Sequence, residues 1–337
     1  MASFYTKDFL PKFSWSMKRD RLMNECELCY GLSYYAQFGG WNEESDALAK
    51  AAYRMKNSNS LRLYYFTQLT DVIKKLLNSQ NQQAQEDIPF STPELMVNHL
   101  REQLNKAFIQ STEMREQWKV KPKGISMIRE LLDCDTLDPG LTKEVTTLMD
   151  IHVNNFFKSK TYKEAIEEKI VDVVLPNPFS FMNLPEYPHL KAYISFPAVL
   201  KNKLNNRITF VSFKSTDTKS DDFQLGTALL FLKHTLQIEG VDEVYFREEW
   251  LESGRSIDRR IDPELMELAK LSIAHSVNAM SEYVVNRDLS LNKPIPIKDF
   301  KRNFEHQEDS SDNCSFDNGE HAYCRQVQKE LLRNRTF

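Results

Sequence analysis

The spacing of apolar residues changes near Ile170, and this change limits the folds that the chain can adopt. Before it, apolar residues recur every three or four positions in LRLYYFTQLTDVIKKLL (61–77) and TPELMVNHLREQLNKAFI (92–109), which predicts amphipathic helices. After it, short segments rich in β-branched and aromatic residues predict strands. These strands are expected at 168–176, 191–200, 207–214 and 241–251.

Two further helices are predicted beyond Ile170. One spans 221–240, where paired aspartates open the helix and Gly240 closes it, and it connects two predicted strands. The other begins at Asp262 and Pro263 and runs to about residue 285. The predicted fold class is therefore α/β, with a mixed sheet core embedded in a helical amino-terminal region and a helical carboxy-terminal cap.

The length of 337 residues allows one large domain or two ordinary ones, and we expect a single domain over residues 1–337. The sequence contains no internal repeat and no low-complexity tract. Its consecutive parts are a mainly helical part (13–165), a mixed sheet (166–251) and a helical cap with a cysteine-bearing tail (252–337). Only 9 glycines in 337 residues are consistent with a helix-rich chain.

Composition excludes several classes of protein. Hydrophobic residues at 41% and charged residues at 27% disfavour disordered, collagen-like and membrane proteins. The net charge of −4 argues against attraction of the whole surface to nucleic acid, but it is compatible with a local basic groove.

The cysteines and the start of the chain predict a location. The five cysteines are an odd number, and MASFYTKDFL has no basic start followed by an apolar run. We expect a cytoplasmic protein without a membrane partner, whose cysteines are thiols or metal ligands rather than disulfides.

A set of spaced motifs resembles a known superfamily. The segments WSMKRDRLMNEC (15–26) and YGLSYYAQFGGW (30–41) are followed by NNFF (154–157), the strand ending in Lys214, FQL (223–225), and cysteines near the carboxy terminus. This order resembles the branch of PD-(D/E)XK nucleases related to RecB-type helicase-nucleases, over residues 13–325. The resemblance implies a restriction-endonuclease-like core that hydrolyses phosphodiesters with Mg²⁺.

The resemblance also implies a set of site positions, and most of them have lost their usual side chains. The family's Asp-x-Lys motif falls on Ser212 and Lys214, and its glutamine falls on Gln224. Its remaining histidine and acidic positions fall on Thr70, on Pro176 or Asn177, and on Pro197. Lys214 and Gln224 remain without the expected carboxylates, which favours a catalytically degenerate member.

Three other acids are candidates for relocated metal ligands: Asp172 on the first predicted strand, and Asp221 and Asp222 at the start of the helix after Lys214. For the two aspartates, capping of the helix is the alternative interpretation. For Lys214 the alternative is a lysine at a strand end that points to solvent.

The cysteines raise a separate hypothesis. Relatives of this kind hold an iron–sulfur cluster between one amino-terminal and three carboxy-terminal cysteines, but Asp317 stands at the middle carboxy-terminal position. Cys26, Cys29, Cys314 and Cys324 together would suit a [4Fe–4S] cluster or, with His321, Zn²⁺. The alternative is that all of them are ordinary thiols.

Aromatic and basic residues near the start of the chain are further candidates for contact with nucleic acid. The cluster Tyr30, Tyr34, Tyr35, Phe38 and Trp41 is interpreted first as core packing and second as a base-stacking surface. Basic residues that could line a groove for a phosphate backbone, or belong to solvated faces, are Lys18, Arg19, Arg21, Lys74 and Lys75. GRSIDRR (254–260) is predicted to be a charged turn, with a phosphate contact as the alternative.

Three functions follow as hypotheses. The first is a degenerate nuclease-like protein that acts as a nucleic-acid-binding or scaffold module in DNA repair or defence. The second is an active Mg²⁺-dependent deoxyribonuclease with relocated carboxylates. The third is a structural module that binds another protein and has no affinity for nucleic acid.

Overall fold

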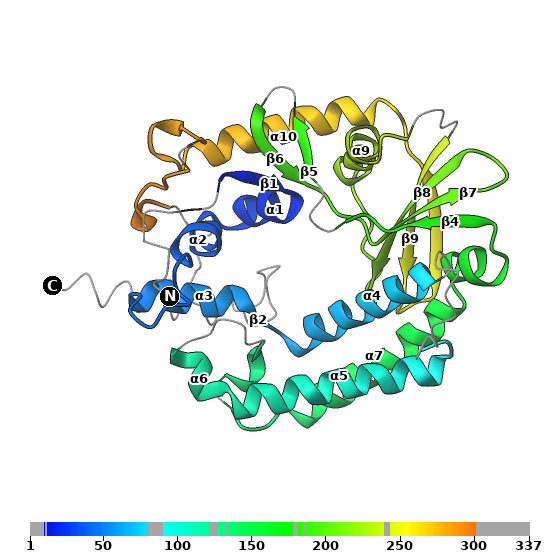
Figure 1. The fold of residues 1–337 in the computed structure, drawn as a ribbon, viewed down its shortest axis with the longest axis horizontal. Coiled ribbons are helices and arrows are strands. Elements are labelled where there is room, and N and C mark those ends of the chain that lie inside the picture. The colour runs from blue at the N-terminus through cyan, green and yellow to red at the C-terminus, as the bar shows by residue number, and fades with distance from the viewer. Residues whose placement is uncertain are drawn as a thin grey trace. The chain divides into compact units, whose positions relative to one another are not determined.

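The computed structural model describes residues 10, 12–79, 90–120, 127–132, 134–177, 181–184, 187–238, 243–290 and 292–300 (Figure 1). The chain forms two compact units, each assembled from segments that are distant in the sequence. One unit comprises Met1–Leu61, Lys106–Leu137 and Ser276–Phe337, and the other comprises Arg62–Asn105 and Asp138–His275. The second of these, here called the sheet unit, contains the candidate site.

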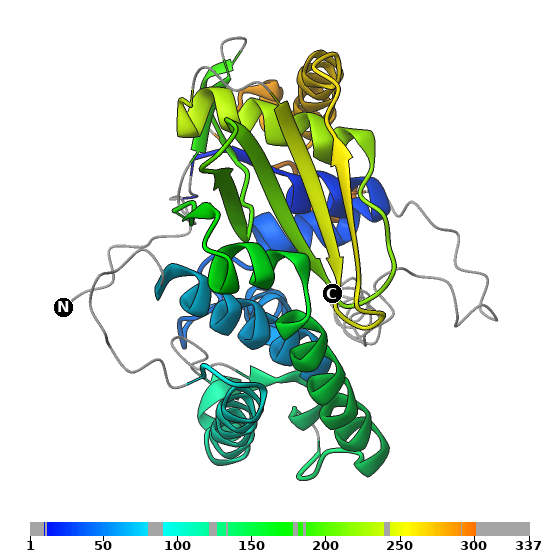
Figure 2. The same ribbon diagram turned by 90° about the vertical axis from the view of Figure 1, so that its right-hand side faces the viewer.

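The sheet unit is built on five strands in the order β10-β9-β8-β7-β4. All neighbours are antiparallel except β8 and β9, which run parallel and are joined through α9 (Asp222–Phe231) and the π-helix η4 (Leu232–Leu236). Figure 2 shows the strands side by side. Their bounds are Val171–Val174 (β4), Ala198–Asn202 (β7), Arg207–Lys214 (β8), Glu243–Trp250 (β9) and Arg255–Arg260 (β10). The mixed sheet and the α/β class predicted from the sequence are confirmed.

Aromatic side chains pack on both faces of this sheet. On one face Phe210 and Phe196 contact Phe231 of α9 (Asp222–Phe231), with ring centroids 6.4 and 5.4 Å apart. On the other face Phe213 contacts Phe156 of α7 (Pro139–Phe157) at 5.9 Å. Because successive side chains of a strand alternate between faces, β8 contributes Phe210 to one layer and Phe213 to the other.

Helix α9 also packs closely on α10 (Leu265–Ser281). A Cβ atom on Gly226 would lie 2.1 Å from the carbonyl oxygen of Leu265, so only glycine allows the two backbones this approach. Further elements of this unit are the hairpin β5 (Phe181–Leu184) and β6 (Tyr187–Tyr193), α8 (Lys160–Tyr162) and the π-helix η3 (Lys163–Glu167), together with most of the helices at 61–79 and 93–113.

The other unit is mainly helical. Its core includes Trp15, which is fully buried and donates from Nε1 to Ser276 Oγ at 3.0 Å. Its elements are β1 (Ser14–Ser16), α1 (Met17–Glu25), α2 (Glu27–Gly31), η1 (Leu32–Ala36), α3 (Ala47–Asn57), α6 (Arg115–Val120), η2 (Arg129–Leu131), η5 (Val285–Arg287), η6 (Ile297–Asp299) and the short parallel pair β2 (Ser58–Asn59) and β3 (Met127–Ile128).

Helices α4 (Leu61–Ser79) and α5 (Pro93–Glu113) confirm the two predicted amino-terminal helices. Other boundaries predicted from the sequence are wrong. The strand expected at 191–200 is divided between β6 and β7 by a break that includes Pro197, which has no amide hydrogen to donate to a ladder. The helix expected to run from 221 to Gly240 ends earlier: α9 passes into η4, and Gln237 at φ 52° is left-handed. Gly240 itself lies outside the described residues.

Two more differences concern the carboxy-terminal cap. GRSIDRR is not a charged turn but the turn and strand of β10, entered through Gly254 at φ 70°. Helix α10 begins at Leu265 rather than Asp262 and ends at Ser281, before the predicted 285.

Among the described helices, none has the length and apolar character needed to cross a membrane.

Candidate functional site

The parallel pairing of β8 and β9 brings an acid beside the Ser212–Lys214 motif. Its register places Ser212 against Glu248 and Lys214 against Trp250. The antiparallel pairing of β7 and β8 ends at Ala198 opposite Val211, one residue before Pro197 and Ser212. The neighbour of Ser212 within the sheet is therefore Glu248 of β9.

Lys214 is largely buried and forms an ion pair with Glu248. Its Nζ donates to Glu248 Oε1 at 2.7 Å and to the carbonyl oxygen of Thr218, and its side chain is 17% exposed. The alternative in which Lys214 points to solvent is therefore wrong.

Glu248 is fully buried and is surrounded by donors. Besides Lys214, its Oε1 accepts from the backbone N–H of Ser220 at 2.6 Å, while its Oε2 lies 3.3 Å from Arg259 Nη2. Burial alone would raise the pKa of Glu248, but the hydrogen bonds from Lys214 and Ser220 outweigh it and hold the pKa below its usual value. Glu248 is therefore a charged acid clamped by two cations.

The loop from 215 to 220 closes over this ion pair. Arg259 donates to the carbonyl oxygen of Ser220, and the indole nitrogen of Trp250 donates to that of Thr218 at 3.3 Å. The loop backbone is therefore fixed by side chains of β9 and β10, and Lys214 lies beneath it.

The three acids expected near Lys214 lie elsewhere or have another role. Asp221 caps α9 by accepting from the backbone N–H of Gln224 at 2.8 Å, and the adjacent Asp222 is exposed, so capping is confirmed for Asp221. Asp172 lies on the edge strand β4, where it is 3.4 Å from Lys203, and β7 separates it from β8. Asp172 could serve as a relocated ligand only if its strand lay beside β8, and the order of the strands does not meet this condition. Gln224 is half-buried in the first turn of α9.

The position expected for a catalytic histidine is occupied by Thr70, whose hydroxyl donates to the carbonyl oxygen of Phe66 at 2.9 Å. A histidine does reach this helix from α7: His152 is buried, and its Nδ1 lies 3.0 Å from the hydroxyl of Tyr65. Burial lowers the pKa of His152 to about 4, so it is neutral at pH 7. No acid is placed beside it in the described contacts, so it provides a packing and hydrogen-bonding group.

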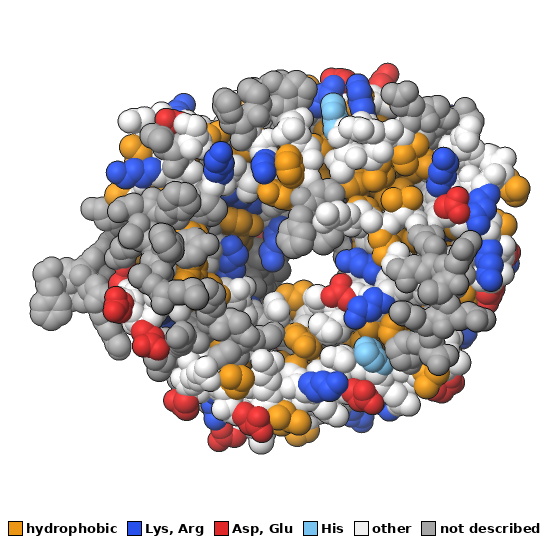
Figure 3. Space-filling view, viewed as in Figure 1, with side chains coloured by type: hydrophobic (Ala, Val, Ile, Leu, Met, Phe, Trp, Pro, Cys, Tyr) orange, Lys and Arg blue, Asp and Glu red, His pale blue; other side chains and the backbone are white. Residues whose placement is uncertain are grey.

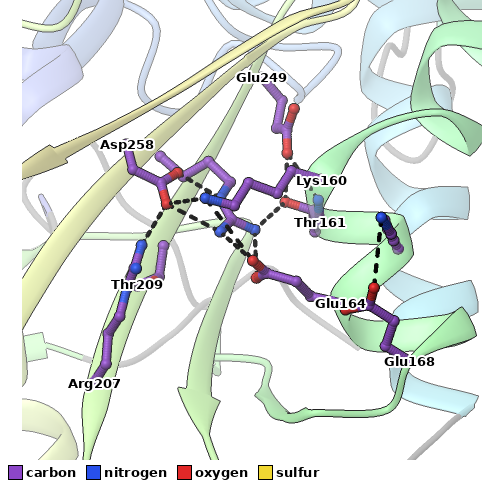
Figure 4. A network of polar contacts seen from close by, with 10 residues as sticks. Lys160, Thr161, Glu164, Glu168, Arg207, Thr209, Glu249 and Asp258 are labelled. Carbon is purple, nitrogen blue, oxygen red and sulfur yellow. Dashed lines mark hydrogen bonds and ion pairs between the residues drawn. The ribbon is translucent and has the colours of Figure 1, made fainter. Parts of the chain in front are cut away.

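The opposite face of β9 carries a second charged cluster (Figure 4). Arg247 is fully buried, and its guanidinium binds Asp258 Oδ1 at 2.7 Å and Glu164 Oε2 at 2.8 Å. Asp258 also binds Lys160 at 2.7 Å and Arg207. Figure 4 shows Lys160 and Glu164 on the helical segment facing Asp258 on the strand. These contacts tie α8 and η3 to β9 and β10.

The pKa values of two carboxylates are shifted in opposite directions: that of Asp258, which belongs to this cluster, and that of Glu249, which lies on the same face of β9. Burial would raise the pKa of Asp258, but Arg247 and Lys160 outweigh it and lower the pKa far below its usual range. Burial raises the pKa of Glu249, although Thr161 donates to its carboxylate from the backbone N–H at 2.9 Å and from the hydroxyl at 2.7 Å. These shifts accompany complete pairing, as expected of a structural network.

Sequence reasoning missed Glu248, Glu249 and Arg247. The signal was FREEW (246–250), where three consecutive charged residues interrupt a strand between Phe246 and Trp250. A strand with parallel neighbours is usually apolar, so charged residues within it require buried partners.

The amino-terminal cysteines have local roles. Cys26 caps α2 and its Sγ accepts from the backbone N–H of Cys29 at 3.4 Å, while Cys29 is buried. Cys314, Cys324 and His321 lie outside the described residues, so the cluster hypothesis stays a prediction. Within the described part of the chain, no group of three or more His, Cys, Asp or Glu side chains is arranged to hold a metal ion.

The aromatic cluster is core packing for its buried members, as predicted. Tyr30 is fully buried and Tyr35 nearly so, whereas Tyr34, Phe38 and Trp41 are half-buried. Tyr30 and Tyr35 meet edge to face with ring centroids 5.7 Å apart.

No family model matches this sequence, and no curated protein matches it.

Proposed function

We propose that the chain is a PD-(D/E)XK nuclease-like protein with a restriction-endonuclease-like core, that it has lost catalysis, and that it acts as a nucleic-acid-binding module in DNA repair or defence. The observation that carries the proposal is the ion pair of Lys214 with Glu248, beneath the 215–220 loop. The lysine that the motif would use to orient a water is held in a structural contact.

The metal chemistry of such nucleases supports loss of catalysis. Mg²⁺ takes about six oxygen ligands and is held in nucleases by carboxylates with open positions for water. Here Glu248 is the acid beside Ser212 and Lys214; its Oε1 accepts from Lys214 and Ser220, while its Oε2 lies 3.3 Å from Arg259 without a hydrogen bond among the described residues. A cation at Glu248 would have to compete with Lys214 and Arg259.

The alternative of an active deoxyribonuclease with relocated carboxylates has less support. It needs at least two acids near Lys214, whereas Asp172 is on the far edge of the sheet and Asp221 caps α9. Glu248 would have to leave its two cations before it could bind metal.

The charge on the surface fits a local rather than a general contact with nucleic acid. Along α5, at the lower rim of the face drawn in Figure 3, acidic and basic side chains are interspersed. Such a surface gives weak attraction as a whole, so binding depends on a particular cluster of cations.

Cleavage and binding assays together test the proposal. Linear and single-stranded DNA should stay intact with Mg²⁺ or Mn²⁺, yet labelled DNA should bind at low salt and be released as salt rises. Metal-dependent cutting that disappears in Lys214→Ala would show an active nuclease. Failure of both single- and double-stranded DNA to bind at low salt would favour the protein-interaction module.

A further inference from the structure

A buried arginine near the start of the chain has no anionic partner among the described residues. Arg19 is 4% exposed, and within the described part of the chain its guanidinium donates to neutral oxygens. The acceptors are the carbonyl oxygen of Ser14 at 2.7 Å and the hydroxyls of Tyr30 and Tyr35 at 3.0 and 3.1 Å. A buried cation is costly unless it is paired, so this arrangement differs from an ordinary buried salt bridge.

One donor of this guanidinium is also unsatisfied. Nε of Arg19 is buried and has no hydrogen-bond partner in the described part of the chain. Arg19 lies 4.4 Å from the ring centroid of Phe13 and 4.6 Å from that of Tyr34, so aromatic faces supply part of its stabilisation.

A second cation shares the ring of Tyr34. Lys56, at the end of α3, lies with Nζ 4.6 Å from that ring centroid and donates to the carbonyl oxygen of Ser33 at 2.8 Å. Desolvation, followed by the nearby charges of Arg19 and Lys18, lowers the pKa of Lys56 to about 8. Arg19 and Lys56 therefore share one aromatic ring, and Lys18 directly precedes Arg19 in α1.

The first turn of α1 carries two cations, Lys18 and Arg19, and one acid, Asp20. Lys18 and Arg19 follow the capping residue Ser16, at the helix end where the backbone dipole favours anions rather than cations. Lys18 and Lys56 are exposed side chains, although the ammonium group of Lys56 lies against the Tyr34 ring, so a ligand can reach both from solvent while Arg19 is buried.

We propose that Arg19, Lys18 and Lys56 form a binding site for a phosphate group of nucleic acid. The identification of this ligand as nucleic acid rests on the proposed function. A phosphodiester would neutralise Lys56 and Lys18, accept from backbone N–H groups of α1, and offset the buried charge of Arg19. The aromatic ring of Tyr34, close to both Arg19 and Lys56, offers an apolar contact for the adjoining sugar or base.

Binding of a fluorescein-labelled single-stranded oligonucleotide and of its duplex to the full chain tests the site. Lys56→Gln and Lys18→Gln should each weaken binding about tenfold at low salt and reduce the slope of log affinity against log salt by about one. Lys50→Gln, on the same helix α3, removes an equal charge and should change the affinity less than about twofold. Lys56→Arg should restore binding.

Inorganic phosphate provides the second arm of the experiment, read as a rise in melting temperature against chloride at equal ionic strength. If the wild type binds DNA and all three glutamine variants bind equally, the site is wrong and the proposed function stands. If DNA does not bind but phosphate stabilises the wild type and not Lys56→Gln, the anion site is supported and nucleic acid is not its ligand. If neither ligand has an effect, both proposals are overturned.

Discussion

Two groups of buried charge in this protein differ in their partners. Around β9, the fully buried Arg247 and Glu248 each meet opposite charges within 3.3 Å. Near α1, the buried Arg19 meets hydroxyls, a carbonyl oxygen and aromatic rings, but no carboxylate among the described residues. A charge whose partners lie in its own fold can be explained by structure alone, whereas a charge without such a partner is a better candidate for contact with a ligand.

The largest expected effect compares the two buried arginines. Arg247→Met should lower the free energy of unfolding by about 4 kcal/mol, because it leaves the carboxylates of Glu164 and Asp258 with fewer partners. Arg19→Met should cost only about 1–2 kcal/mol, because it leaves neutral hydroxyls of Tyr30 and Tyr35, which are 3.2 Å apart and can bond each other. Urea unfolding measures both, and equal losses would remove the distinction.

The second effect concerns the clamp beneath the 215–220 loop. Lys214→Ala should destabilise the protein by about 3 kcal/mol because it leaves Glu248 buried with one cation fewer. The double variant Lys214→Met with Glu248→Leu should recover most of this loss, since the fully buried carboxylate is gone and Arg259, which loses its partner, is partly exposed.

The matched control for this cycle is Arg101→Ala. It breaks an exposed pair with Asp150 in the same unit and should cost at most about 1 kcal/mol. A double variant that is no more stable than Lys214→Ala would mean that the clamp contributes more than charge compensation.

Acid should reduce the stability that the ion pairs around β9 contribute. The pKa values of Asp258 and Glu248 are lower in the folded protein than in the unfolded chain, so their stabilisation is present above about pH 4 and is lost as the pH falls through the folded values. We expect a loss of about 2 kcal/mol between pH 4 and pH 2 from these groups. In Arg247→Met this acid-dependent loss should be smaller, and an unchanged pH profile of unfolding would argue against the assigned pairing.

A rise in pH should weaken the binding of DNA to the cations near α1. The pKa of Lys56 is lowered to about 8, and a bound phosphate would raise it, so DNA binding should take up a proton near this pH. Affinity should fall about threefold to tenfold as the pH rises from about 7 to about 9. Lys56→Arg stays charged and should show a flatter profile, so equal profiles would place Lys56 outside the site.

The elements that the sequence predicts best are those with a strong local signal. Helices α4 and α5 follow their apolar spacing, and Asp221 caps α9 as a local interaction. The strand β10 was missed because Arg255–Arg260 is mostly polar, and its charged side chains acquire their partners only from other elements. Pro197 divides a segment that composition alone reads as one strand.

The candidate site was harder to predict because it depends on register. Lys214 and Glu248 are far apart in the sequence and meet only through the parallel pairing of β8 with β9, which aligns Ser212 with Glu248. Asp172 was a candidate ligand because it lies on the first predicted strand, but β7 lies between its strand β4 and the strand β8 that carries Lys214. Local patterns define the strands but not which strands are neighbours.

The most direct test crosses two variants with two measurements, the free energy of unfolding and the affinity for labelled DNA at low salt. Lys214→Met should lose stability and keep its DNA affinity when assayed well below its melting temperature. Lys56→Gln should keep its stability and lose DNA affinity about tenfold. The reverse pattern, in which Lys214 controls binding and Lys56 controls stability, would contradict the account.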